Sequence, residues 1–274
     1  MSVINTNIKS LISQNALTRN GRDVANAMQQ LSTGKRINSA ADDAAGLAIS
    51  NKMTSQIRGL NQAVRNANDG ISMLQTAEGA TQEITNMLQR MRELAVQAAN
   101  DTYSDTDRDA LDKEKVELEE EITRIAKNTK WNNMAFLDNA GVTKSFQVGI
   151  ANNEDSTIAV EFVDLTASGL DIVGLDVSSH VASQSALDKI DTAIADVDDF
   201  RADVGAKINR LNFAIDNLTN ISINTSASRS RIEDADFAKA SSELARTQII
   251  QQAATAVLAQ ANTDQQSVLK LLQG

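Results

Sequence analysis

The chain contains no proline among its 274 residues. Because proline removes a backbone donor and clashes with the preceding helical turn, its absence permits helices of unusual length. Aromatic residues make up only 3% of the chain, which is too few for the bulky core of a typical globular domain. The sequence therefore favours slender helix-on-helix packing.

The N-terminal segment has apolar residues at gaps of mainly four, three and seven positions. The members of this stripe are Ile4, Ile8, Leu11, Leu17, Val24, Met28 and Leu31. The spacing predicts either the seam of a coiled coil or an amphipathic helix in a bundle. Gly34 is a natural helix stop, and Ser39, Asp42 or Asp43 can cap the helix that follows.

Further helices are predicted over 47–100, 106–128 and 185–221, each with a regular apolar stripe. The charge-rich run 112–121 is typical of a solvated helix face. We expect a polar joint at 220–230, followed by a last helix whose stripe includes Ile250, Ala253, Ala254, Val257, Leu258 and Ala261.

The middle of the chain has a strand-like pattern of apolar residues, whereas both ends have helical periodicity. Residues 145–150 and 157–163 alternate like strands, and 152–155 form a plausible turn between them. Because long helices lie on both sides of this insert, the two ends must run out and back together. The expected fold class is mainly α: a long antiparallel coiled-coil or helical-bundle rod with a small β-hairpin in the middle of the chain.

Composition excludes several classes of function. The net charge of −10 argues against nucleic-acid binding, which needs cations to neutralise phosphates. No stretch approaches the ~20 apolar residues of a membrane-spanning helix. With no cysteine and the single histidine His180, neither a thiolate site nor an HExxH zinc site can form. We expect no enzyme activity, no cofactor and no metal, and Asp42-Asp43 is not interpreted as a catalytic pair.

Several motifs together carry a resemblance to a known family. Residues 4–7 read INTN, 31–46 read LSTGKRINSAADDAAG, 88–97 read LQRMRELAVQ, 230–237 read SRIEDADF and 257–262 read VLAQAN. These motifs resemble the terminal regions of bacterial flagellins, here in a short form without large outer variable domains. Hook–filament junction proteins share the terminal architecture, but the chain resembles the filament subunit more closely.

The resemblance implies a structural subunit that polymerises into the flagellar filament for swimming motility. Residues 1–38 and 230–274 would form a terminal coiled-coil domain lining the inner tube. Residues 39–140 and 181–229 would form the helical rod, with 141–180 as its small β-rich part. The N-terminus lacks the pattern of a cleavable signal peptide, and the resemblance implies export of the unfolded chain by the flagellar type III system to the cell exterior.

The implied partners are other copies of the chain, an export chaperone, the filament cap and the hook–filament junction proteins. Packing between subunits is expected to involve one set of terminal residues: Ile4, Ile8, Leu11, Leu31, Arg36, Asp42, Asp43, Arg231, Glu233, Asp234, Leu244, Ile250, Val257, Leu258, Leu269 and Leu272. The charged members, with Asp236, could instead cap helices or lie in water.

Two further sites are implied by the resemblance. Arg90, Leu94 and Glu114 match positions of the flagellin site recognised by Toll-like receptor 5, although these residues could equally serve subunit packing. Val268, Leu269, Leu271 and Leu272 resemble the leucine-rich end that cytosolic innate receptors sense, or they cap the inner coiled coil.

The free energy gained by burying apolar side chains within one terminal helix pair is smaller than the free-energy cost of the conformational entropy lost on ordering about 70 residues. The tails are therefore expected to be disordered in the monomer and ordered in the polymer. A secreted coiled-coil adhesin or translocator, the alternative class, would instead be a stable monomer or small oligomer.

Overall fold

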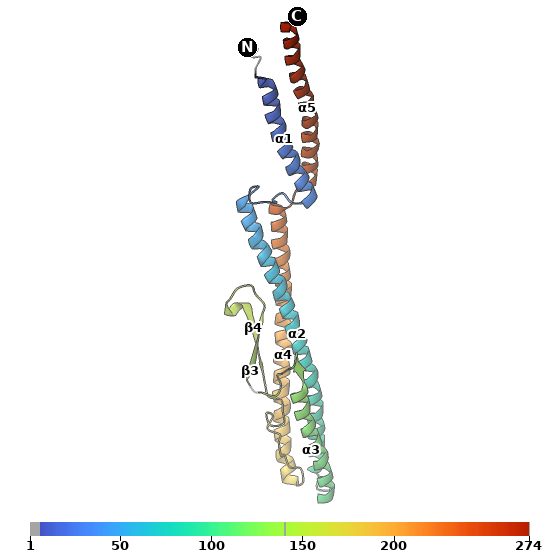
Figure 1. Ribbon diagram of the computed structural model, residues 1–274. Coiled ribbons are helices and arrows are strands. Elements are labelled where there is room, and N and C mark those ends of the chain that lie inside the picture. Colours follow the sequence, from blue (N-terminus) through green and yellow to red (C-terminus); the bar gives the residue numbers. More distant parts are fainter. Residues whose placement is uncertain (1–5, 140, 274) are drawn as a thin grey trace. The chain divides into compact units, whose positions relative to one another are not determined.

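The computed structural model describes residues 6–139 and 141–273, with side chains up to residue 263. Five α-helices dominate this part of the chain (Figure 1): α1 Ile8–Thr33, α2 Ala44–Ala98, α3 Asp105–Asn128, α4 His180–Glu233 and α5 Phe237–Gln273. Two short antiparallel hairpins join β1 Lys130–Trp131 to β2 Met134–Ala135 and β3 Val142–Gln147 to β4 Thr157–Phe162. A 3₁₀ turn, Glu154–Ser156, precedes β4. The expected mainly α fold with a small hairpin is confirmed.

The chain divides into two compact units. Residues 1–55 and 224–274 form the first, here called the terminal unit, and residues 56–223 form the second, called the central unit. The long helices α2 and α4 contribute to both units. The three-part division into 1–38 with 230–274, a rod and a β-rich part stays a prediction.

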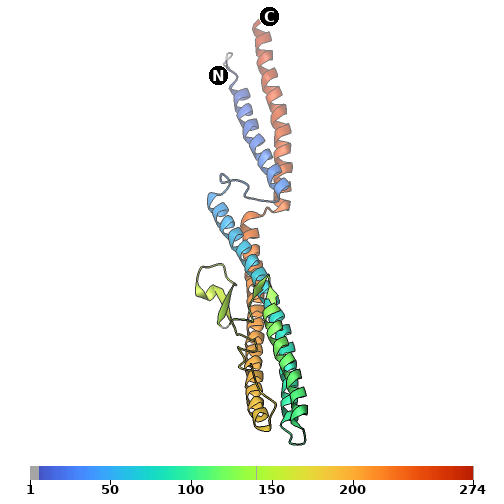
Figure 2. The ribbon, with the colours of Figure 1, turned by 60° about the horizontal axis from the view of Figure 1, so that its bottom comes forward.

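The central unit is held by a continuous apolar core. In α2, Leu74, Ile84 and Leu88 are fully buried among residues of α3, α4 and the β3–β4 hairpin. The hairpin lies against the helices, as both ribbon views show (Figure 2). Phe162 of β4 contacts Phe136 edge-to-face with ring centroids 5.2 Å apart and lies 6.1 Å from the Phe200 ring of α4. This core fixes the hairpin on α4.

The hairpin positions differ slightly from the expectation. β4 agrees with the predicted strand 157–163, whereas β3 ends at Gln147 rather than 150. Val148 N still donates to Ser156 O at 2.8 Å, and the predicted turn lies within the longer loop beyond this bond. The β1–β2 hairpin was not predicted. Its two-residue turn, Asn132-Asn133, has φ of 47° and 62°, as a type I′ turn requires.

The predicted polar joint at 220–230 is wrong, because α4 continues to Glu233. This segment contains neither glycine nor proline, and its polar side chains are accommodated on the helix. Ser228 Oγ donates to Asn224 O at 2.9 Å, and Ser222 Oγ donates to Asn61 Oδ1 of α2 at 3.1 Å. Polarity alone therefore does not end a helix.

The interpretation of 112–121 as a solvated face is wrong at one position. Lys115 is only 2% exposed. Its Nζ donates to Leu175 O and lies 3.5 Å from Asp112 Oδ1 and 3.6 Å from Glu119 Oε2. The loop before α4 covers this face of α3, so the lysine binds a backbone carbonyl of that loop.

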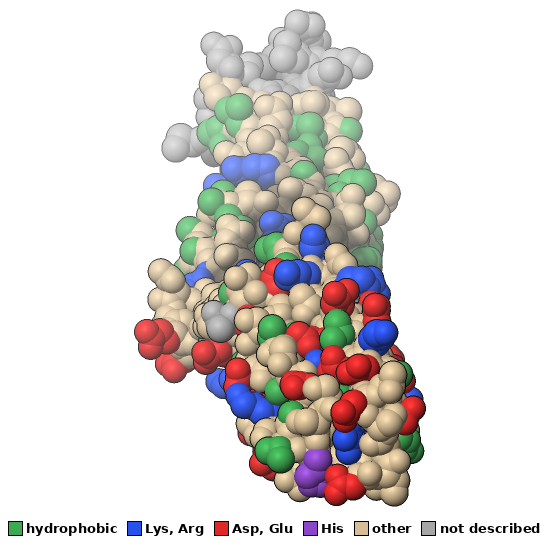
Figure 3. Space-filling view, turned by 90° about the horizontal axis from the view of Figure 1, so that it is seen from below, with side chains coloured by type: hydrophobic (Ala, Val, Ile, Leu, Met, Phe, Trp, Pro, Cys, Tyr) green, Lys and Arg blue, Asp and Glu red, His purple; other side chains and the backbone are tan. Residues whose placement is uncertain are grey.

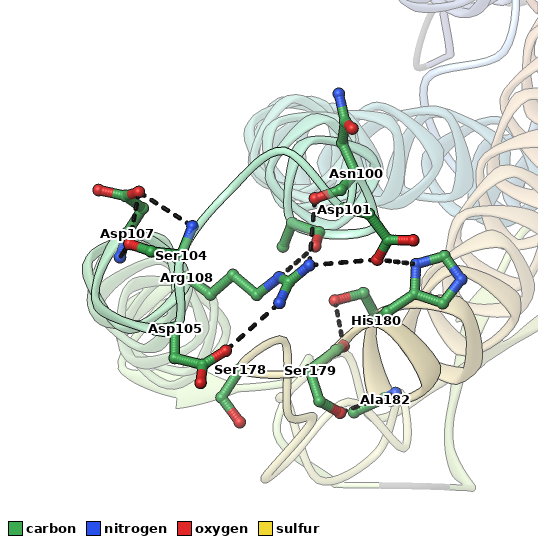
Figure 4. Close-up of polar contacts among 12 residues, drawn as sticks. Asn100, Asp101, Ser104, Asp105, Asp107, Arg108, Ser178, Ser179, His180 and Ala182 are labelled. Atoms are coloured by element: carbon green, nitrogen blue, oxygen red, sulfur yellow. Dashed lines mark hydrogen bonds and ion pairs between the residues drawn. The ribbon is translucent and has the colours of Figure 1, made fainter.

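At one end of the central unit, the α2–α3 loop meets the start of α4 (Figure 4). The buried Arg108 binds Ala98 O at 2.9 Å and Asn100 O at 3.1 Å, and His180 Nδ1 lies 2.6 Å from Ala99 O. These bonds satisfy carbonyls at the end of α2 and just beyond it, where the helix offers no further amide partners. His180 is thus a structural contact of this loop.

Charge is distributed unevenly along the chain. The central unit has 28 acidic and 15 basic residues, so the acidic excess of the whole chain lies there. Figure 3 shows many acidic side chains on the face that carries the histidine, one of them beside it. Within the described residues no cluster of three or more His, Asp or Glu could hold a metal ion. None of the described helices combines the length and apolarity that crossing a membrane requires.

Candidate assembly interface

The terminal unit is built from α1 and α5, which run antiparallel (Figures 1 and 2). Their seam contains small and polar residues that the partner helix buries: Ser10, Asn20 and Ala27 from α1, and Ala240, Thr247 and Ala261 from α5. Asn20 Nδ2 donates to Thr247 O at 2.8 Å. Near the end of the pair, Asn7 Nδ2 donates to Ala261 O at 3.0 Å. These two bonds fix the register of the pair.

Large apolar side chains of the same two helices point away from this seam. Their exposed fractions lie between 39% and 66%, and the set is Ile8, Leu11, Ile12, Met28, Phe237, Ile249, Ile250 and Val257. Ile8, Leu11 and Ile12 line a shallow groove along α1 that ends at Arg19. In the central unit, by contrast, most large apolar residues of α2 are buried. The apolar patch that Ile8, Leu11 and Ile12 form along this groove is typical of an interaction site.

The seam therefore has a different phase from the predicted one. On α1, Leu17, Val24 and Leu31 are half-buried and follow the buried Ser10 at intervals of seven residues. On α5, Leu244 and Leu258 are half-buried as well. Six members of the predicted stripes are exposed instead: Ile8, Leu11, Met28, Ile250, Ala253 and Val257. Small residues in the seam allow close approach of the helices, and the larger ones are left outside. Ile4, Leu269 and Leu272 lie outside the described side chains.

A short bridge joins the inner ends of the two helices to the rest of the terminal unit. Lys35 and Asp234 form an antiparallel β-bridge. Arg36 N donates to Glu233 O at 2.7 Å, and Ala235 N donates to Gly34 O at 2.9 Å. Gly34 has φ of 69°, a left-handed conformation that glycine adopts without strain. This bridge sets where α1 and α5 begin to pair.

The charged residues predicted at this interface make contacts within one chain. Glu233 binds Lys35 Nζ and Ser50 Oγ, and these two bonds hold the pKa of its carboxyl below the ordinary value. Asp42 accepts from the backbone of Ser39 at 2.8 Å and Asn38 at 3.0 Å, which lowers its pKa.

Three other charged candidates differ in their surroundings. Asp43 Oδ1 accepts from Gly46 N at 2.8 Å, and Asp43 Oδ2 lies 3.8 Å from Arg36. Asp234 contributes its backbone to the bridge. Arg231 is exposed and has no ion pair among the described residues. Contacts of this charged set with other copies stay a prediction.

The predicted receptor residues lie on α2 and α3 of the central unit. Arg90 Nε donates to Glu114 Oε1 at 2.8 Å and Nη1 to Glu93 Oε2 at 3.0 Å, which raises the pKa of the Arg90 guanidinium. Leu94 is only 1% exposed. The Leu94 side chain thus faces the core of the central unit, and its part in receptor recognition stays a prediction.

Comparisons with known proteins agree with this geometry. Residues 4–141 match the family model of the bacterial flagellin N-terminal helical region, and residues 187–272 match that of the C-terminal helical region. A flagellin of Halalkalibacterium halodurans is 46% identical, covering 98% of this chain and 99% of that protein. Flagellin A of Vibrio cholerae is 36% identical with the same coverage. The crystal structure of Bacillus cereus flagellin, at 34% identity, covers 60% of this chain and 94% of that chain with a TM-score of 0.51.

A helix pair with a small, polar seam and exposed large apolar side chains is typical of one class of protein: helical subunits that associate with other chains. With both family models matched, the chain belongs to the bacterial flagellin family. It is a structural subunit of the extracellular flagellar filament, not an enzyme.

Proposed function

We propose that the exposed apolar faces of α1 and α5 are the surfaces through which copies of this subunit join in the filament. One observation supports this proposal most directly: eight large apolar side chains of the terminal unit point away from its own seam. Burial of such side chains against neighbours contributes about 1.5–3 kcal/mol each when complete. In this role Ile8, Leu11, Ile250 and Val257 would contact other copies directly. Leu31, Leu244 and Leu258 would support them from the seam.

The composition of the seam between α1 and α5 supports export of the chain in an unfolded state, through the flagellar type III system. A seam of Ser, Asn, Thr and Ala buries little apolar area, and isolated helices gain most of their stability from packing. The terminal pair would therefore open easily before assembly. An export chaperone would cover the outer face of α5, where Ile249, Ile250 and Val257 are exposed. The filament cap and the hook–filament junction proteins would meet subunits at the two ends of the polymer.

Seeded polymerisation tests the proposed interface. Purified chain mixed with filament seeds is expected to form long filaments, visible by negative-stain microscopy and recovered by sedimentation. Chains lacking 1–38 or 230–274 are expected to stay in the supernatant, while circular dichroism still shows a helical central unit. Filaments formed equally well by either truncated chain would contradict the proposal.

We also propose that Arg90 and Glu114 form part of a surface recognised by Toll-like receptor 5. The supporting observation is that both side chains are about half exposed and paired across α2 and α3. Leu94 would shape this surface from beneath, through packing. The leucine-rich C-terminal end lies outside the described side chains, and its recognition by cytosolic receptors stays a prediction.

Alanine variants test the receptor surface. Arg90→Ala and Glu114→Ala are each expected to reduce receptor signalling by monomeric protein about tenfold, as truncation of an interface anchor does. Their unfolding midpoints in urea should change little, because exposed ion pairs contribute only ~0–1 kcal/mol. Arg124→Ala, which breaks an exposed pair with Glu121 elsewhere on α3, is the matched control. Signalling equal to that of the control would exclude this surface.

A further inference from the structure

A groove opens in the central unit between β4, the segment that follows it and the middle of α4. Its volume is ≈ 820 Å³. Five carboxylate side chains line it: Glu161, Asp164, Asp196, Asp199 and Asp203. Apolar side chains, including Leu165, Leu170 and Phe200, form its floor. The groove thus combines an apolar floor with a negatively charged rim.

No cation neutralises this rim within the described residues. The lining includes neither lysine nor arginine, and none of the five carboxylates takes part in an ion pair. Arg201 is close in sequence, but its Nη2 donates to Gln82 Oε1 at 2.7 Å and its Nη1 lies 3.7 Å from Asp198. A concave site lined by one sign of charge raises the local concentration of groups of opposite charge. The groove therefore suits a cationic group joined to an apolar one.

On α4, a cationic and an apolar side chain lie close together on the C-terminal side of the groove residues. Phe213 is 75% exposed, the largest exposed fraction among the large apolar side chains that the structure describes. Arg210 is exposed as well, and it forms no ion pair or side-chain hydrogen bond in the described part of the chain. Residues three apart on a helix are neighbours on its surface. Arg210 and Phe213 thus present a cation beside an aromatic ring.

The chain cannot bring these two features together by itself. Asp199 and Phe213 both lie on α4, which is unbroken from His180 to Glu233. Their 14-residue separation corresponds to about 21 Å along a rigid helix. Phe213 therefore cannot reach the part of the groove near Asp199 in its own chain, whereas a second molecule can place both Arg210 and Phe213 there.

We propose that Arg210 and Phe213 of one subunit dock into the acidic groove of a neighbouring copy. The guanidinium would lie against the rim near Asp199, and the ring would cover the apolar floor. Because the two surfaces differ, the contact is heterologous and can repeat along a polymer rather than close on itself. The inference rests on the proposed function, since filament assembly supplies the neighbouring copies, but it assigns a second contact outside the terminal unit.

Charge reversal with rescue tests this contact. Arg210→Glu and Asp199→Lys are each expected to raise the critical concentration for elongation of seeds about tenfold, as loss of an interface anchor does. The double variant R210E/D199K restores complementary charge and should return to within about threefold of wild type. Phe213→Ser should weaken elongation without rescue. Lys113→Glu on α3, an exposed position with the same charge change, is the control.

Each outcome decides the proposal. Single variants that elongate seeds as well as the Lys113→Glu control would overturn it, and so would a double variant no better than the singles. Formation of a closed dimer that depends on Arg210, observed by sedimentation without seeds, would show that the contact closes on itself. That result would overturn the proposal too. Failure of the wild-type chain to elongate seeds would instead overturn the proposed function itself. Unchanged circular dichroism confirms that each variant is folded.

Discussion

A chain carrying Leu11→Gln and Ile12→Gln is expected to remain folded in its central unit but to lose elongation of filament seeds. The two side chains are 55% and 65% exposed in the subunit. Covering them in the polymer contributes roughly 2–4 kcal/mol together, given about 1.5–3 kcal/mol for each complete burial. Since each 1.4 kcal/mol changes an equilibrium constant tenfold, the critical concentration should rise by about 30- to 1,000-fold. Glutamine keeps a high helix propensity, so α1 itself is not disrupted.

The control for this variant removes exposed apolar side chains from the central unit instead. Val116 and Val181 are 38% and 71% exposed, and Val116→Gln with Val181→Gln should elongate seeds nearly as wild type does. The measurement is the protein left in the supernatant after sedimentation at increasing total concentration. A critical concentration of the α1 variant equal to that of this control would exclude the α1 face as an interface.

Lys115→Ala is expected to destabilise the central unit by roughly 2–4 kcal/mol. Removing one partner of a buried ionic contact leaves the others without compensation and costs about 3–5 kcal/mol. The lower range applies here because Asp112 and Glu119 keep partial contact with water, whereas the Leu175 carbonyl loses the ammonium that binds it.

Urea unfolding followed by circular dichroism measures this effect. Lys113→Ala, two residues away on the exposed face, should change the free energy of unfolding by less than about 0.5 kcal/mol. Lys115→Met keeps most of the apolar stem but not the charge, so it should remain clearly less stable than wild type. If Lys115→Ala and Lys113→Ala unfold at the same urea concentration, the buried lysine has no structural role.

Much of the fold could be predicted from periodicity. The helices at 47–100 and 106–128 lie within three residues of α2 and α3, because their apolar stripes pack into a core that apolar residues dominate. The strand pair was found for a similar reason. Its β4 residues alternate between buried and exposed positions, a pattern typical of an antiparallel strand packed on a core.

The terminal seam could not be predicted in the same way. Hydrophobic periodicity assigns the largest apolar residues to the seam, whereas Ser10, Asn20 and Thr247 occupy it here. A polar residue buried by one neighbouring helix looks, in the sequence, like any solvated residue. Lys115 was missed for the same reason, since a distant loop buries it. The apolar stripe of Ile8, Leu11 and Met28 was therefore found in the sequence, but it was wrongly assigned to the seam between α1 and α5.

The central claim is that the outer faces of α1 and α5 find cover only among copies of this chain. Amide hydrogen exchange, compared residue by residue between monomer in dilute solution and filament, tests it most directly. We expect amides of 8–33 and 237–263 to exchange rapidly in the monomer and to become strongly protected in the filament, while 74–98 are protected in both. Equal, strong protection of both chain ends in the monomer would contradict the claim.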